Sequence, residues 1–157
     1  MDKLWLSRSW TTSPRRDGEP PDAYHFVDSP SFEAHAAAGG FLEWNSVFGH
    51  LYGTPVPDAP GGHDVLLEID VQGARDVKER QPDAVVVLVL PPSREAQEER
   101  LRRRGDRPES IARRLAMAAG EEDAGRALAD HVVVNDDLGR AIDEAVGIVE
   151  THRAGRS

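Results

Sequence analysis

The stretch Val65-Leu66-Leu67-Glu68-Ile69-Asp70 decides the fold class, together with a second apolar run, Ala84-Val85-Val86-Val87-Leu88-Val89-Leu90. Runs with so little polar alternation are typical of strands that helices cover on both faces. The residues from Gly73 to Lys78, between the two runs, are the expected start of a crossover helix. The sequence therefore predicts an α/β fold with a doubly wound, mainly parallel sheet.

Further elements are predicted outward from this unit. Toward the C-terminus we expect a helix at 93–103 with Ser93 as its cap, a helix at 109–129, a buried strand at 131–135 and a helix from 138 to about 151. Toward the N-terminus we expect strands at 4–10 and 24–27, a helix from Ser29 that Gly39 and Gly40 end, and an antiparallel unit from 41–48 and 51–53. The prediction is one domain over 1–157, with a core of 1–12 and 61–157 and an inserted mixed subdomain at 13–60.

Composition and charge exclude several classes of function. The 157 residues are 39% hydrophobic and 30% charged, as in a soluble domain, and no apolar run approaches the roughly 20 residues that span a bilayer. The net charge of -9 disfavours a general nucleic-acid binder, which needs basic surface to displace counterions. There is no cysteine and no signal-peptide pattern, so we expect a cytoplasmic protein. Any anionic ligand must therefore be met by local arginine clusters.

Two segments carry groups that suit a nucleotide. Residues 7–13 form a hydroxyl-rich strand end that runs into Arg15 and Arg16, whose forked donors match phosphate oxygens. A solvated loop is the alternative for this segment. Glu43 can accept the two N–H donors on guanine's ring edge, and the Thr54 hydroxyl can donate to its carbonyl oxygen. For the second segment, the alternative is an amphipathic hairpin without a ligand.

Two charged clusters have similar double interpretations. Glu68 and Asp70 share one face at the end of an apolar strand, where they could bind a base or hold Mg²⁺ through water, or simply form a polar strand terminus. An arginine run around the turn at 105–108 suits a lid, at about 100–114, that closes over phosphates. Its alternative is a solvated helix face paired with glutamates. The run consists of Arg100, Arg102, Arg103, Arg104, Arg107, Arg113 and Arg114.

The order and spacing of these segments resemble the guanylate kinase family, and the resemblance covers essentially the whole chain. It implies a P-loop-class nucleoside monophosphate kinase with an inserted GMP-binding subdomain and a helical lid. It also implies the reaction ATP + GMP to ADP + GDP, with Mg²⁺ accompanying ATP. The motifs are Ser-x-Ser-x-Thr-Thr at 7–12, Arg16-Asp17-Gly18-Glu19, Tyr24-His25-Phe26-Val27, Phe41-Leu42-Glu43-Trp44, Tyr52-Gly53-Thr54-Pro55, the run from Leu66 to Ala74, Leu90-Pro91-Pro92-Ser93, Arg104-Gly105 and Val134-Asn135-Asp136-Asp137.

The resemblance also implies roles for individual residues. The GMP phosphate would be held by Ser9, Arg16, Tyr24 and Tyr52, with Glu19 supporting the arginine. Guanine would be recognised by Glu43, Thr54 and Asp70, with Glu68 near the metal and phosphates. The catalytic lid arginines that contact ATP would be Arg100, Arg104 and Arg114, and Asn135 would lie against adenine. No residue is implied as a direct metal ligand.

Two departures from the family pattern stand out. Ser13 occupies the position where the family has an arginine after Thr-Thr, and Arg15 is the candidate substitute. The family's first strand, its Gly-rich loop ending in Gly-Lys and the following helix have no counterpart, since Lys3 and Lys78 are the only lysines and neither completes Gly-x-x-x-x-Gly-Lys. We expect a truncated or misassigned gene start and impaired catalysis. Without that first strand, two apolar strand edges would stay unpaired, so we also expect a poorly stable chain.

Two alternatives to a kinase remain. One is a non-catalytic guanylate-kinase-like module whose GMP site has become a surface for acidic or phosphorylated peptides. The retained Glu43, Asp70 and lid arginines argue against it, because a peptide binder needs neither guanine-reading acids nor a lid. The other is a pseudo-enzyme that binds GMP and regulates an intact partner. GMP binding without turnover would identify it.

Overall fold

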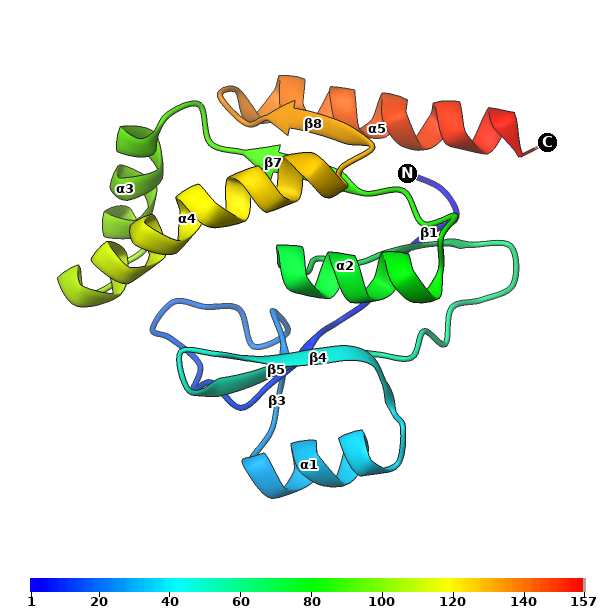
Figure 1. Ribbon diagram of the computed structural model, residues 1–157. Helices are drawn as coiled ribbons and strands as arrows, with labels where there is room; N and C mark the ends of the chain where they lie inside the picture. The colour runs from blue at the N-terminus through cyan, green and yellow to red at the C-terminus, as the bar shows by residue number, and fades with distance from the viewer. Residues whose placement is uncertain (157) are drawn as a thin grey trace. The chain divides into compact units, whose positions relative to one another are not determined.

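The structure is a computed structural model that describes residues 1–156 (Figure 1). The chain forms two compact units, Met1–Pro82 and Asp83–Ser157. Each unit contains parallel strands and helices, so the α/β class predicted from the sequence is confirmed. No helix within residues 1–156 is both long and apolar enough to cross a membrane.

The first unit contains two sheets. One is a parallel pair, in which β1 (Leu4–Leu6) lies beside β6 (Asp64–Leu66). The other is a mixed sheet with the strand order β3-β2-β5-β4. Its β2 and β3 are parallel, and its other pairs are antiparallel. The four strands are β2 (Trp10–Thr11), β3 (His25–Phe26), β4 (Phe41–Val47) and β5 (His50–Pro55).

The single strand predicted at 4–10 is wrong, because the chain changes sheets within it. The amide of Ser7 still donates to the carbonyl of Leu66, which belongs to β6, at 3.0 Å. Two residues later, the carbonyl of Ser9 accepts from the amide of His25 at the start of β3, at 2.8 Å. The hydrogen-bonding partner therefore switches between Ser7 and Ser9, and one apolar-polar alternation yields two short strands.

Two capped helices belong to the first unit. Helix α1 (Ser29–Ala37) begins where the sequence predicted, and the Asp28 carboxylate caps it by accepting from the amide of Ser31 at 2.9 Å. Helix α2 (Val71–Arg80) is capped by Asp70, whose Oδ1 accepts from the amide of Gly73 at 2.8 Å. A carboxylate at this position also interacts favourably with the helix dipole. One of the candidate guanine-binding acids therefore has a fixed place at the start of α2.

The aromatic core of the first unit joins α1 to the β4–β5 hairpin. Phe32 of α1 is fully buried, and its ring centroid lies 4.5 Å from that of Phe41 and 6.0 Å from that of Trp44. Gly53 of β5 lies opposite, and a Cβ atom built there would approach Cζ of Phe32 to 2.9 Å. The glycine therefore provides the space that lets the rings pack on the hairpin.

The second unit is built around one parallel pair. Strand β7 (Val87–Leu90) runs beside β8 (His131–Val134). In this parallel pair, Val87 lies opposite His131 and Leu90 lies opposite Val134. Ser93 caps α3 through its hydroxyl, which accepts from the amide of Ala96 at 3.1 Å, as the sequence predicted. The helices are α3 (Arg94–Arg103), α4 (Pro108–Leu128) and α5 (Leu138–Gly155), all within a residue or two of the predictions except for the longer C-terminal end of α5.

The strands predicted at 65–70 and 84–90 are too long. The first ladder ends at Leu66, and the second begins at Val87. Within residues 1–156, β6 pairs only with the three-residue β1 and β7 only with the four-residue β8, so each ladder is limited by its partner. Apolar side chains on these strands stay exposed, including Leu66 at 41% and Val89 at 56%.

Candidate functional site

The β4–β5 hairpin places four polar side chains on one face. Glu43 pairs with Thr54 and Asn45 pairs with Tyr52, and directly opposite residues in an antiparallel pair point to the same side. The register shifts between Phe41 and Glu43, which leaves Leu42 as the extra residue of a β-bulge. Its carbonyl accepts a hydrogen bond from Nη1 of Arg80, so the bulge also contacts α2.

Glu43 and Thr54 form a buried hydrogen-bonded pair. The Thr54 hydroxyl donates to Oε1 of Glu43, and Thr54 is only 1% exposed and Glu43 only 6%. Burial raises the pKa of Glu43, and the nearby Asp70 charge raises it further, while the Thr54 hydroxyl opposes the shift. The two residues that the sequence assigned to guanine therefore contact each other directly.

Helix α2 approaches this carboxylate closely at Gly73. A Cβ atom built on Gly73 would lie 2.9 Å from Oε2 of Glu43 and 3.1 Å from its Cδ. In the sequence, Gly73 was expected only to begin a crossover helix and to belong to the motif from Leu66 to Ala74, with no contact assigned to it. Its role in the structure is to leave room for the Glu43 side chain.

Asp70 lies beside the same pair, held by a residue that the sequence analysis missed. Nδ2 of Asn45 donates to both carboxylate oxygens of Asp70, at 3.1 Å each. The signal that could have identified Asn45 is its position two residues after Glu43 on a strand, which places both on one face. The predicted acids Glu43 and Asp70 are thus brought together by β4 and the start of α2.

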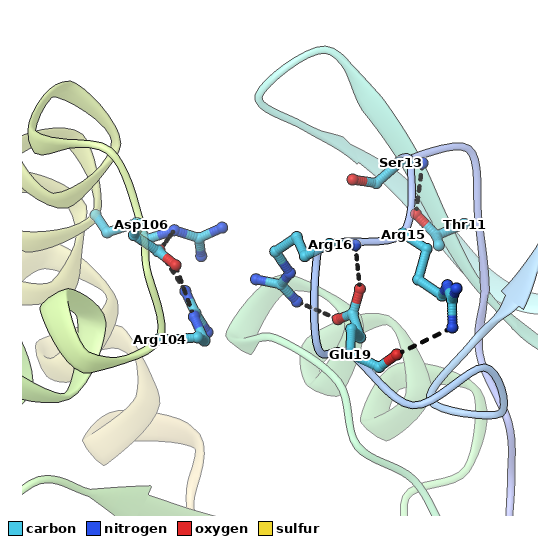
Figure 2. A network of polar contacts seen from close by, with 8 residues as sticks. Thr11, Ser13, Arg15, Arg16, Glu19, Arg104 and Asp106 are labelled. Atoms are coloured by element: carbon cyan, nitrogen blue, oxygen red, sulfur yellow. Dashed lines mark hydrogen bonds and ion pairs between the residues drawn. The ribbon is translucent and has the colours of Figure 1, made fainter.

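A second group of side chains suits the phosphate end of a nucleotide (Figure 2). The Arg16 guanidinium pairs with Oε1 of Glu19, and the Arg16 amide donates to Oε2 at 3.1 Å. Nη1 of Arg15 donates to the Glu19 carbonyl at 3.3 Å, so both arginines gather around this acid. The support that Glu19 was predicted to give Arg16 is present as a direct ion pair.

Two tyrosines lie next to this arginine. The rings of Tyr24 and Tyr52 meet edge to face with their centroids 5.9 Å apart. The pKa of Tyr24 is raised, first by burial and then by Tyr52, while the Arg16 charge opposes the shift and Glu19 and Glu68 add to it. The structure therefore brings Arg16, Glu19, Tyr24, Tyr52 and Glu68 into one neighbourhood.

The remaining residues of the N-terminal loop have mainly backbone roles here. Ser9 is half-buried at the break between β1 and β2, where its carbonyl accepts a hydrogen bond from the amide of His25 in β3. The amide of Ser13 donates to the Thr11 hydroxyl at 3.0 Å, which forms a local turn (Figure 2). The Thr12 hydroxyl accepts from the amide of Leu51 at 2.9 Å and ties the loop to β5.

In the second unit, a buried acid that the sequence analysis missed holds two of the predicted lid arginines. The Asp106 side chain is 5% exposed, and its Oδ1 accepts from Nε of Arg104 at 2.8 Å (Figure 2). Its Oδ2 lies 3.3 Å from Nε of Arg114. Arg102 and Arg103 instead pair with Glu98 and Glu99 one helical turn earlier, so for these two the solvated-face alternative holds.

A cavity of about 280 Å³ lies in the second unit beside the predicted ATP-side residues. Nη2 of Arg100 donates to the carbonyl of Asn135 at 2.8 Å, which joins two of these residues across 35 positions of sequence. The cavity is lined by Val89, Leu90, Pro91, Gln97, Arg100, Leu101, Arg104 and Asn135. Three of the four residues assigned to ATP by resemblance therefore border one hollow.

Residues 1–156 contain no group of three or more His, Cys, Asp or Glu side chains arranged to hold a metal ion. Mg²⁺ in phosphoryl-transfer sites keeps several waters and is bound by one or two carboxylates together with substrate phosphates. Glu68, whose charge acts on Tyr24, is one carboxylate beside the candidate phosphate-binding residues that fits such a minimal role.

The raised pKa of Glu43 predicts opposite effects of pH on stability and on binding. A folded-state pKa above the unfolded value contributes stability that is present at low pH and is lost as pH rises through the folded pKa. The affinity for a ligand that binds the ionised carboxylate increases over the same range of pH, by up to about tenfold per pH unit. Urea unfolding and calorimetry with GMP at several pH values, compared with Glu43→Gln, would isolate both effects. Parallel pH profiles for the two proteins would contradict the prediction.

Comparisons with known proteins agree with the geometry. A family model described as guanylate kinase matches residues 2–152. A guanylate kinase of Symbiobacterium thermophilum is 47% identical over 155 residues, which cover 95% of this chain and 73% of that protein. A guanylate kinase of Thermus thermophilus is 46% identical over 162 residues, which cover 98% of this chain and 73% of that protein. The crystal structure of guanylate kinase from Anaplasma phagocytophilum superposes with a TM-score of 0.78 at 33% identity, covering 96% of this chain and 77% of the other. The resemblance inferred from the motifs is confirmed, and the chain belongs to the guanylate kinase family.

Proposed function

We propose that this chain carries the GMP site of an ATP:GMP phosphotransferase. The observation that carries the proposal is the buried Glu43–Thr54 pair with Asp70 beside it. Guanine presents N1–H and a 2-amino group as donors and a carbonyl oxygen as acceptor, so the acids accept from the donors while the Thr54 hydroxyl turns to the carbonyl oxygen. Adenine presents an unprotonated N1, which repels a carboxylate at the same place.

The phosphate end follows from the second group of side chains. Tyr52 is two residues from Thr54 on β5, which corresponds to about 6.6 Å along the strand. It lies on the side of Thr54 that faces Tyr24 and Arg16. Arg16 supplies forked donors and the tyrosines supply hydroxyls to the GMP phosphate, while Glu19 keeps the Arg16 guanidinium in place. Ser9 is assigned to the same phosphate by family resemblance.

On the donor side, we assign Arg100, Arg104 and Arg114 to the phosphates of ATP and Asn135 to its adenine. The reaction moves the γ-phosphoryl group from ATP to a phosphate oxygen of GMP, and ADP leaves. When Mg²⁺ is bound with ATP, it would neutralise charge that develops during transfer, and Glu68 is the residue that would help to hold it through water. Asp106 aligns two of the arginines before ATP arrives, because it is bonded to both Arg104 and Arg114.

Residues 1–157 contain no Gly-x-x-x-x-Gly-Lys pattern, whose backbone amides and lysine hold the donor phosphates in P-loop enzymes. We therefore propose that these 157 residues bind GMP but transfer phosphate slowly or not at all. A non-catalytic GMP-binding module is the second candidate. Turnover, and not binding, distinguishes the two.

Calorimetry with GMP and AMP tests the proposed site, and coupled ADP release with ATP, Mg²⁺ and GMP tests the reaction. We expect GMP to bind at least tenfold more tightly than AMP, a difference of about 1.4 kcal/mol. We expect no detectable ADP release from this chain. Equal affinity for the two nucleotides would overturn the proposed guanine site, and robust ADP release would overturn the proposed impairment.

A further inference from the structure

Asn45 is a polar side chain beside Glu43 and Thr54, and the proposed function gives Asn45 no role. It lies two residues after Glu43 on the same face of β4 and is half-buried. Its Nδ2 donates to both oxygens of Asp70 at equal distances of 3.1 Å. Asn45 therefore contacts one candidate guanine-binding acid from the strand that carries the other.

The Asp70 carboxylate is held from two directions. The amide of Gly73 in α2 donates to Oδ1 at 2.8 Å, and Asn45 in β4 donates to both oxygens. Donors from two different elements fix the plane of a carboxylate better than one donor can. Each carboxylate oxygen can accept more than one hydrogen bond, so Asp70 keeps acceptor capacity for a ligand.

Asn45 satisfies Asp70 while its own carbonyl oxygen stays unsatisfied. Among the residues that the structure describes, Oδ1 of Asn45 is buried and has no hydrogen-bond partner. A buried acceptor without a donor destabilises a fold, so an asparagine at this position is unfavourable for stability alone. The amide cannot be turned over to relieve this, because its oxygen would then face the Asp70 carboxylate.

Building on the proposed function, we propose that Asn45 is a positioning residue that sets the preference for guanine over hypoxanthine by aiming Asp70 at the exocyclic 2-amino group. Hypoxanthine differs from guanine only in lacking that amino group. GMP and IMP therefore form a matched pair of ligands in which one hydrogen-bond donor is removed. A residue that acts through Asp70 should therefore affect the affinity for GMP more than the affinity for IMP.

Calorimetry of the full chain with GMP and IMP tests this proposal. We expect Asn45→Ala to lower the ratio of the IMP dissociation constant to the GMP dissociation constant by about 3- to 10-fold, because the bond to an oriented acid weakens. The melting temperature should not fall, since the variant also removes the unsatisfied carbonyl. Ser46→Ala, one position along and on the opposite face of β4, is the matched control and should leave the ratio unchanged.

The background variant Asp70→Ser separates positioning from direct contact. Serine still caps α2 but is too short to reach a ligand as the carboxylate does. Adding Asn45→Ala to this background should change the ratio no further. An unchanged ratio for Asn45→Ala alone, or an equal drop in the Asp70→Ser background, would overturn the proposal. Equal binding of GMP and AMP by the unmodified chain would instead overturn the proposed function, so the two failures are distinguishable.

Discussion

Replacing Glu43 with glutamine is expected to weaken GMP binding by about 30- to 150-fold, or about 2–3 kcal/mol. The change keeps the size of a side chain that is only 6% exposed, and it removes the negative charge that strengthens hydrogen bonds from guanine's N1–H and amino group. An amide nitrogen facing these donors would also repel them. The measurement is calorimetry with GMP and AMP, and the preference for GMP should nearly disappear.

Glu79→Gln is the matched control for this variant. Glu79 lies exposed on α2, in the same unit, and undergoes the identical change of atoms and charge. We expect its GMP affinity to stay within about twofold of the unmodified chain, because the charge it removes is in solvent and is screened. A similar loss in both variants would mean that net charge, and not the Glu43 carboxylate, governs binding.

Gly73→Ala is expected to lower GMP affinity by at least tenfold even though alanine is the better helix former. The added methyl group would lie 2.9 Å from Oε2 of Glu43, so the buried carboxylate must move away from its bond with Thr54. Helix propensity gains about 1 kcal/mol, whereas overpacking of this kind costs about 1–3 kcal/mol. Calorimetry with GMP and thermal unfolding would measure the two effects separately.

Gly147→Ala in α5 provides the comparison, since nothing lies within 4 Å of a Cβ atom built there. That variant should gain about 0.5–1 kcal/mol of stability and leave GMP binding unchanged. If Gly73→Ala behaved in the same way as Gly147→Ala, the close approach of α2 to Glu43 would have no bearing on the site.

Helices were predicted from the sequence more accurately than strands. Ser93 marks a helix start through its hydroxyl cap, so α3 begins within one residue of the prediction. Pro108 was predicted to lie in the preceding turn, but its ring fixes φ at a helical value and α4 begins there, one residue before the predicted start. A strand exists only where a partner runs beside it. The apolar run at 84–90 therefore says nothing about the length of β8, which limits the ladder of β7.

The sequence suggested members of the proposed site only where a residue's own chemistry points to a role. A carboxylate and a hydroxyl in neighbouring motifs suggested a guanine site at Glu43 and Thr54, and the structure places these two side chains in contact. Asn45 and Asp106 were missed, because their importance depends on which acid or arginine the fold places beside them. The role of Gly73 was equally hidden, since its close approach to Glu43 is made through space between residues far apart in the chain.

The tip of the hairpin determines which residues of β4 and β5 face one another. Phe48 and Gly49 both have positive φ, 52° and 82°, as a two-residue type I′ turn requires, and Val47 pairs directly with His50. Counting back from this turn one residue at a time on each strand brings Glu43 opposite Thr54, before the bulge at Leu42 shifts the register. Exposed loops normally tolerate insertions. Here a single added residue would shift the register and turn one partner toward the opposite side of the sheet, so the length of the loop is itself a condition for the proposed recognition of the base.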